Sequence, residues 1–72
     1  MPRLPAISGK EAIKAFERLG YERKRQRGSH VVMSFPGRRP IVVPEHGDMK
    51  RGTLRSIIRD SGFTVEEFLE AL

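Results

Sequence analysis

The chain has 72 residues, no cysteine and a formal net charge of +5. A chain of this length buries only about 60% of the surface that it exposes when unfolded, which excludes a second domain or a large cofactor pocket. The lack of cysteine excludes disulfides and thiolate metal sites, and no run approaches the ~20 apolar residues of a membrane span or the apolar core of a signal peptide. We therefore expect a single domain over residues 1–72 that is soluble and cytoplasmic.

The first predicted element is a helix that begins after Ser8. Ser8 and Glu11 have the spacing of a capping box, in which each side chain satisfies a free backbone amide of the first turn. One face of this helix is apolar at helical spacing, and it consists of Ala12, Ile13, Ala15, Phe16 and Leu19. Gly20 stands where a left-handed residue is expected to end the helix.

Three strands are predicted between Tyr21 and Pro44. Residues 21–27 are almost all polar, which indicates an exposed edge strand whose charges oppose aggregation. Gly28 separates this strand from a second one, in which apolar and polar positions alternate over residues 30–35, as in a half-buried strand. Residues 36–39 form a turn, and the third strand, Ile41 to Val43, is closed by Pro44.

Two helices follow a polar loop over residues 45–51. The first carries Leu54, Ile57 and Ile58 on one face and ends at Gly62. The second is short and starts with another capping box, Thr64 and Glu67. The order α-β-β-β-α(-α) predicts an α+β fold, a two-layer sandwich with helices on one face of an antiparallel three-stranded sheet.

The charge is unevenly distributed along the chain. Residues 1–59 hold all fourteen Lys and Arg residues against five acidic residues, whereas residues 60–72 hold four acidic residues and no basic one. A strongly cationic body with an acidic end is typical of a protein that contacts a polyanion, and nucleic acid is the first candidate.

His30 is the principal candidate for chemistry, because it opens the second strand next to a glycine and after a basic run. If the turn between the second and third strands is centred on Gly37–Arg38, His30 lies opposite Glu45, whose carboxylate would favour the imidazolium. A one-residue change of the loop would instead pair His30 with His46. The sequence leaves open which of the two applies.

This constellation suits the cleavage of RNA, in which the 2′-hydroxyl attacks the adjacent phosphate. The reaction needs a base, an acid and cations on the phosphate, and a histidine can supply a proton transfer. We predict His30 as the catalytic residue, with His46, Glu45 and Ser29 as candidates for support. The predicted RNA-binding residues are Arg23, Lys24, Arg25, Arg27, Lys50, Arg51 and Arg55.

The remaining motifs do not favour another kind of site. Ser29 and His30 are adjacent in a strand, so their side chains point to opposite faces, which argues against a Ser–His nucleophilic pair. The acidic and histidine side chains have no recurring ligand spacing, so neither a metal nor a cofactor is expected. Tyr21 and Phe35 could stack on bases, but Phe35 is better interpreted as a core residue and Tyr21 as a cap over the first helix.

The chain resembles the HicA family of small bacterial toxins over nearly its whole length. The resemblance lies in an ordered set of segments rather than in one motif: Ser8 to Glu11, Leu19 to Tyr21, Gly28 to His30, Val43 to Gly47, Lys50 to Arg59 and Glu66 to Leu69. It implies a fold related to double-stranded RNA-binding domains. It also implies an mRNA interferase, an endoribonuclease of a toxin–antitoxin system whose active-site histidine is the one in the Gly-Ser-His motif, here His30.

The resemblance further implies mRNA as the substrate and a HicB-type antitoxin that covers the active site. Two alternatives remain. The cationic charge suits a non-catalytic RNA-binding module of the double-stranded RNA-binding type equally well. An interaction protein that binds an acidic partner through its cationic face would share the same surface.

Overall fold

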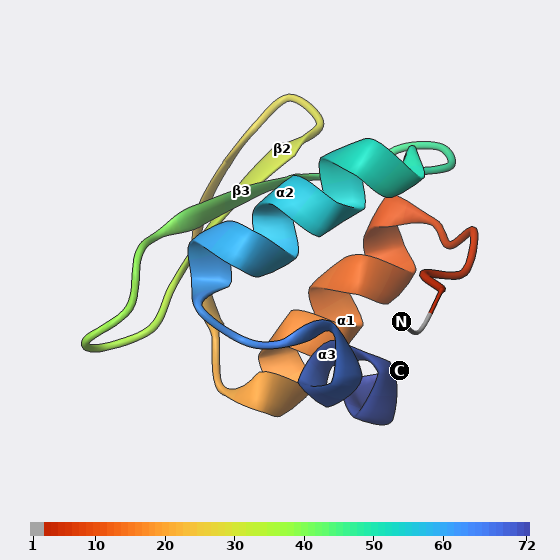
Figure 1. Cartoon of the computed structure of the whole chain (residues 1–72). Coiled ribbons are helices and arrows are strands. Elements are labelled where there is room, and N and C mark those ends of the chain that lie inside the picture. Colours follow the sequence, from red (N-terminus) through yellow and green to blue (C-terminus); the bar gives the residue numbers. More distant parts are fainter. Residues whose placement is uncertain (1–2) are drawn as a thin grey trace.

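The computed structural model describes residues 3–72 and shows an α+β fold with helices on one side of a three-stranded sheet (Figure 1). The antiparallel sheet has the order β1-β2-β3. The elements in chain order are α1 (Gly9–Leu19), β1 (Glu22–Arg27), β2 (His30–Ser34), β3 (Ile41–Pro44), α2 (Arg51–Ser61) and α3 (Val65–Ala71). The predicted α-β-β-β-α(-α) order is confirmed.

The helix ends are set by local interactions. Ser8 and Glu11 form both halves of the predicted capping box of α1, and Gly20 ends this helix with a φ of +116°. Thr64 and Glu67 form the same box on α3. The α2 helix begins after Lys50, which makes no side-chain capping hydrogen bond, and it ends at Gly62 as predicted.

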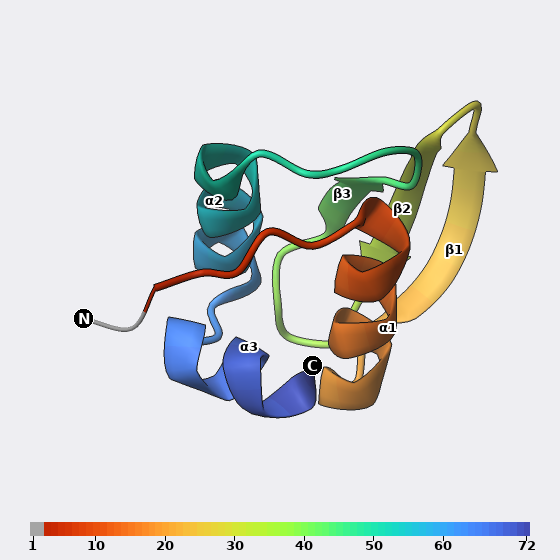
Figure 2. The ribbon, with the colours of Figure 1, turned by 90° about the vertical axis from the view of Figure 1, so that its right-hand side faces the viewer.

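The core lies between the sheet and the helices. Val31 and Met33 of β2 point inward, and so do Ile41 and Val43 of β3, while the residues between them point outward. The helices contribute their apolar faces, which include Ala12, Ile13, Ala15, Phe16, Leu54, Ile57, Ile58 and Phe68. The face of the sheet away from the helices is thereby left without a covering layer (Figure 2).

Two segments outside the regular elements also reach the core. Leu4 and Ile7 of the N-terminal segment are buried, and so is Met49 of the loop before α2. A backbone hydrogen bond of 2.9 Å from the Met49 amide to the Ile7 carbonyl joins the two segments. The loop over residues 45–51, which the sequence predicts to be polar, therefore also carries one core residue, Met49.

Tyr21 is a core residue and does not offer a stacking platform for bases. Its side chain is 2% exposed and packs edge-on against Phe16, with 5.8 Å between the ring centroids. Its hydroxyl donates to the carbonyl oxygen of Arg39 at 2.8 Å, and the carbonyl oxygen of Ser61 lies 3.4 Å away. Tyr21 packs on the first helix through Phe16, as expected, but it does so as a buried part of the core.

Burial of this phenol makes the stability of the fold sensitive to alkaline pH. Desolvation raises the pKa of Tyr21 above its ordinary value of 10.0. The charge of Arg38 lowers this pKa by a smaller amount, and the charge of Asp60 raises it further. The stabilisation from the neutral phenol is complete below pH 10 and is lost as the pH rises through the higher pKa of the folded state. We expect the free energy of unfolding of Tyr21→Phe, measured with urea, to fall less steeply above pH 10 than that of the wild type; parallel curves would contradict this.

The turn between β2 and β3 is attached to the far end of α2. The Arg38 guanidinium lies over the Phe63 ring at 3.8 Å from its centroid and over the Phe35 ring at 5.1 Å. Arg38 Nη1 also donates to the carbonyl oxygen of Ser61 at 3.2 Å. Phe35 is partly buried against the core, in agreement with its predicted place. These contacts fix the turn and therefore the register of the two strands.

Candidate active site

The two-residue turn Gly28–Ser29 delivers His30 to the uncovered face of the sheet. Gly28 has a φ of +56°, which suits the first central position of a type II′ hairpin turn. Arg27 and His30 are the strand residues that the turn joins. Because Val31 points into the core, its neighbour His30 points away from the helices, and His30 is exposed.

The register places His30 in a row of side chains across the sheet. His30 pairs with Arg27 of β1 on one side and with Pro44 of β3 on the other. The next row on the same face is Arg25, Val32 and Val42, of which Val42 is 49% exposed. Cross-strand partners in an antiparallel sheet share a face. The structure therefore brings Arg25 and Arg27 to the same surface as His30.

The predicted pairing of His30 with Glu45 is wrong, and so is the alternative pairing with His46. The observed pairs of β2 and β3 are centred on Gly37 instead of between Gly37 and Arg38. The loop contains a tight turn around Pro36–Gly37, in which the Arg38 amide donates to the Phe35 carbonyl and Gly37 has a φ of +82°. Proline followed by such a glycine is the pattern of a type II turn. The partner of His30 is consequently Pro44, and Glu45 belongs to the opposite face of the sheet.

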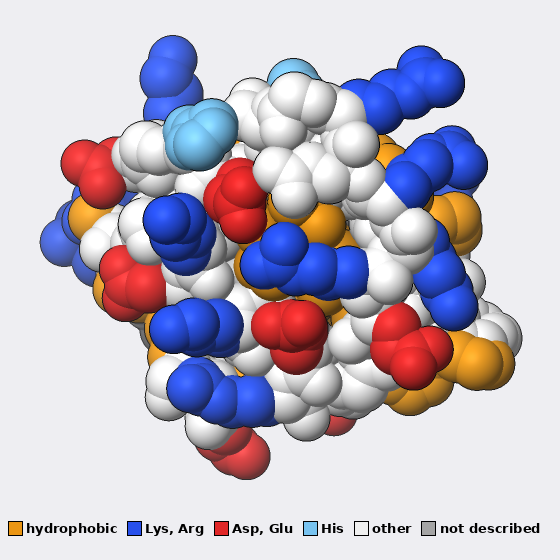
Figure 3. All heavy atoms as spheres, turned by 180° about the vertical axis from the view of Figure 1, so that it is seen from behind, with side chains coloured by type: hydrophobic (Ala, Val, Ile, Leu, Met, Phe, Trp, Pro, Cys, Tyr) orange, Lys and Arg blue, Asp and Glu red, His pale blue; other side chains and the backbone are white. Residues whose placement is uncertain are grey.

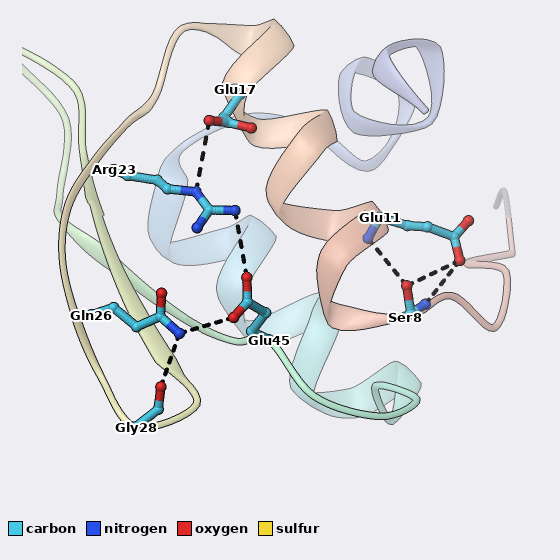
Figure 4. A network of polar contacts seen from close by, with 7 residues as sticks. All are labelled: Ser8, Glu11, Glu17, Arg23, Gln26, Gly28 and Glu45. Carbon is cyan, nitrogen blue, oxygen red and sulfur yellow. Dashed lines mark hydrogen bonds and ion pairs between the residues drawn. The ribbon is translucent and has the colours of Figure 1, made fainter.

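Glu45, which follows β3, instead binds two side chains of β1 on the helix side of the sheet (Figure 4). One carboxylate oxygen accepts a hydrogen bond of 2.9 Å from Gln26 Nε2, and the other lies 3.5 Å from Arg23 Nη2. Arg23 also lies 3.9 Å from Glu17 of α1. Arg23 is thus engaged by two carboxylates on the helix side of the sheet, whereas Arg25 and Arg27 are on the side of His30.

The remaining predicted site residues lie around this surface. Lys24 is exposed and 3.6 Å from Glu22. Ser29 is half-buried, and its carbonyl oxygen accepts from the Glu45 amide at 2.6 Å. His46 is exposed in the loop that follows β3.

Figure 3 shows Lys and Arg side chains spread over the face seen from behind, with acidic side chains between them and histidine side chains at its upper edge.

The basic residues at the start of α2 form a separate group. Lys50, Arg51 and Arg55 are exposed. In Figure 2 the start of α2 and the end of β1 lie at the same upper end of the molecule, on opposite sides of it, with the loop after β3 running between them.

Sequence reasoning missed Gln26 and Pro44. Gln26 links Glu45 to the turn, since its Nε2 also donates to the Gly28 carbonyl oxygen at 2.9 Å. Pro44 flanks His30 across the sheet. The role of neither residue can be recognised from one sequence, because each role depends on which residues the strand register brings together.

Other kinds of site are not indicated within residues 3–72. No group of three or more histidine and acidic side chains there is arranged to hold a metal ion. None of the helices in that range has the length and apolar character needed to cross a bilayer. What the described surface can do chemically is exchange a proton through an exposed imidazole while a neighbouring guanidinium binds an anion.

Comparison with known proteins assigns the chain to a family. No curated protein matches it. A family model described as the HicA toxin of bacterial toxin–antitoxin systems matches residues 9–63, which include α1, the whole sheet and α2. The match covers about three quarters of the 72 residues and contains His30 and all seven predicted RNA-binding residues. The chain therefore belongs to the HicA family of toxins.

Proposed function

We propose that this toxin is an endoribonuclease that cleaves mRNA and that His30 is its catalytic residue. The observation that carries the proposal is the position of His30, exposed on the uncovered face of the sheet and paired across strands with Arg27. The exposed His30 side chain contributes nothing to the packing of the core, so a structural role does not explain its position. A protein that only binds RNA needs the cations but no group that transfers protons.

The proposed reaction is transesterification within the RNA. The 2′-oxygen forms a bond to the adjacent phosphorus, and the bond from phosphorus to the 5′-oxygen breaks, which leaves a 2′,3′-cyclic phosphate and a 5′-hydroxyl. A base removes the proton of the 2′-hydroxyl and an acid protonates the departing 5′-oxygen. His30 supplies one of these transfers, and Arg27 and Arg25 stabilise the negative charge on the phosphate.

Membership of a toxin–antitoxin family implies an antitoxin partner. We propose that this partner is of the HicB type and that it covers the surface around His30. Covering this surface would exclude RNA from the imidazole and from the row of cations beside it.

The test is to incubate the purified chain with end-labelled mRNA and to analyse the products on denaturing and native gels. Fragments that end in a 2′,3′-cyclic phosphate, and their loss when a HicB-type antitoxin is added, are the expected result. Intact RNA in a retarded band would instead identify a binding module. Salt dependence does not separate the two, because both functions use phosphate contacts.

A further inference from the structure

The tip of the β1–β2 hairpin that carries His30 has little packing of its own. All six residues of β1 are exposed, and no atom beyond the chain neighbours of Gly28 lies within 4 Å of the position that a Cβ on Gly28 would take. The sheet has three strands at His30, which pairs with Arg27 and with Pro44, and the Gly28–Ser29 turn extends just beyond this row. The position of the turn that leads into His30 therefore depends on hydrogen bonds and ion pairs more than on side-chain packing.

Glu45 provides these interactions from the side of the sheet opposite to His30. Its side chain is 14% exposed, and it is bound by Arg23 and Gln26 of β1. The Gln26 amide that donates to Glu45 also donates to the Gly28 carbonyl, and the Glu45 backbone amide donates to the Ser29 carbonyl. Both residues of the turn are thus connected to Glu45, as Figure 4 shows for the Gln26–Gly28 side.

Glu45 is itself held by the packing of α1. Gly9, the first residue of α1, lies so close to the strand end that an added Cβ would overlap the Pro44 carbonyl oxygen and come within 2.8 Å of the Glu45 carbonyl oxygen. The Gly9 amide donates to the Gly47 carbonyl at 3.2 Å. The core of the molecule is in this way connected through Glu45 to the hairpin tip.

We propose that Glu45 is a positioning residue, whose contacts with Arg23, Gln26 and the Gly28–Ser29 turn fix the backbone from which His30 projects. The inference rests on the proposed function for His30. Glu45 does not touch the substrate, because it lies on the helix side of the sheet. It acts on cleavage only through the geometry of the turn, where small displacements of a reacting group cost about 10- to 100-fold in rate.

The test compares Glu45→Ala with Glu45→Gln and with Glu17→Ala. Glu17→Ala is the matched control, because it removes the same charge and the other carboxylate of Arg23 but leaves the turn untouched. We expect Glu45→Ala to lower kcat for RNA cleavage about tenfold with little change in KM. Glu45→Gln, which keeps an acceptor for Gln26, restores most of the rate, and Glu17→Ala keeps the wild-type kcat.

Amide hydrogen exchange of residues 28–30, measured by NMR, gives a readout that does not depend on catalysis. We expect faster exchange in Glu45→Ala and in Gln26→Ala, and unchanged exchange in Glu17→Ala. Exchange at wild-type rates in Glu45→Ala, or equal effects of Glu45→Ala and Glu17→Ala on kcat, would overturn the proposal. If the wild type does not cleave RNA, the proposed function fails, while the exchange rates still decide whether Glu45 holds the turn.

Discussion

Replacing His30 with alanine is expected to lower the rate of RNA cleavage by about 100-fold or more, the usual contribution of a general acid or base. The reason is that His30 is the histidine that the hairpin places beside Arg27 and Arg25 on the uncovered face of the sheet. The measurement is the initial rate of cleavage of labelled mRNA by the purified variant. Growth arrest on expression is expected to disappear with it.

The loss is expected without damage to the fold. His30 is exposed and its side chain fills no part of the core, so substitution there changes the free energy of unfolding by only about 0.5 kcal/mol. Thermal unfolding and antitoxin binding of His30→Ala therefore serve as controls. Cleavage by a folded His30→Ala at the wild-type rate would show that His30 is not catalytic.

His46→Ala, made side by side, decides what the second histidine contributes. His46 lies in the loop after β3, and the hydrogen-bonded register pairs His30 with Pro44 instead of with a residue of that loop. We expect the loss of activity in His46→Ala to be much smaller than in His30→Ala. Equal losses would assign the second proton transfer to His46.

Gly9→Ala is expected to destabilise the protein by about 3 kcal/mol or more, at the upper end of what overpacking costs. The added methyl group would overlap the carbonyl oxygen of Pro44, and the contact involves backbone atoms that no rotamer change can move. A domain of this size has a total stability of roughly 4–11 kcal/mol, so the loss would be a large part of it. The measurement is the midpoint of unfolding in urea.

Gly52→Ala is the matched control for this prediction. Gly52 also lies in the first turn of a helix, and an added Cβ meets nothing within 4 Å. The same substitution there is expected to stabilise the protein by about 0.5–1 kcal/mol, because alanine has the higher helix propensity. Opposite signs for the two variants would confirm that the close approach of α1 to the Pro44–Glu45 backbone is responsible. A neutral Gly9→Ala would contradict it.

The elements of the fold could be predicted from the sequence because their signals are local. The capping boxes at Ser8 and Thr64 and the left-handed glycines at Gly20 and Gly62 each act within about four residues, and all of them are present. The alternation of β2 correctly predicted which of its residues are buried. The buried N-terminal residues Leu4 and Ile7 lie in no periodic pattern, and their place in the core had no such signal.

The partners within the candidate site depended on the register of one hairpin. The sequence identified His30 and placed it on a strand next to cationic residues, but the expected register of β2 and β3 was one residue away from the observed one. With a side-chain period of two, that difference moves Glu45 to the opposite face and replaces a carboxylate beside His30 with Pro44. Arg23 and Arg25 lie on opposite faces of the sheet, because a bulge lies between them in β1, and only Arg25 shares the face of His30.

The sequence by itself determined the family resemblance, the order of helices and strands, the cationic character of the chain and the histidine on which the proposed chemistry depends. Only the tertiary structure decided that Glu45 binds Arg23 and Gln26, that Arg27 and Pro44 flank His30, and that Tyr21 is buried. The physical reason is the separation along the chain of the residues that interact. Caps and periodicity are satisfied within a few residues of chain, whereas the neighbours of a side chain across a sheet are set by turn geometry and by the packing of distant segments.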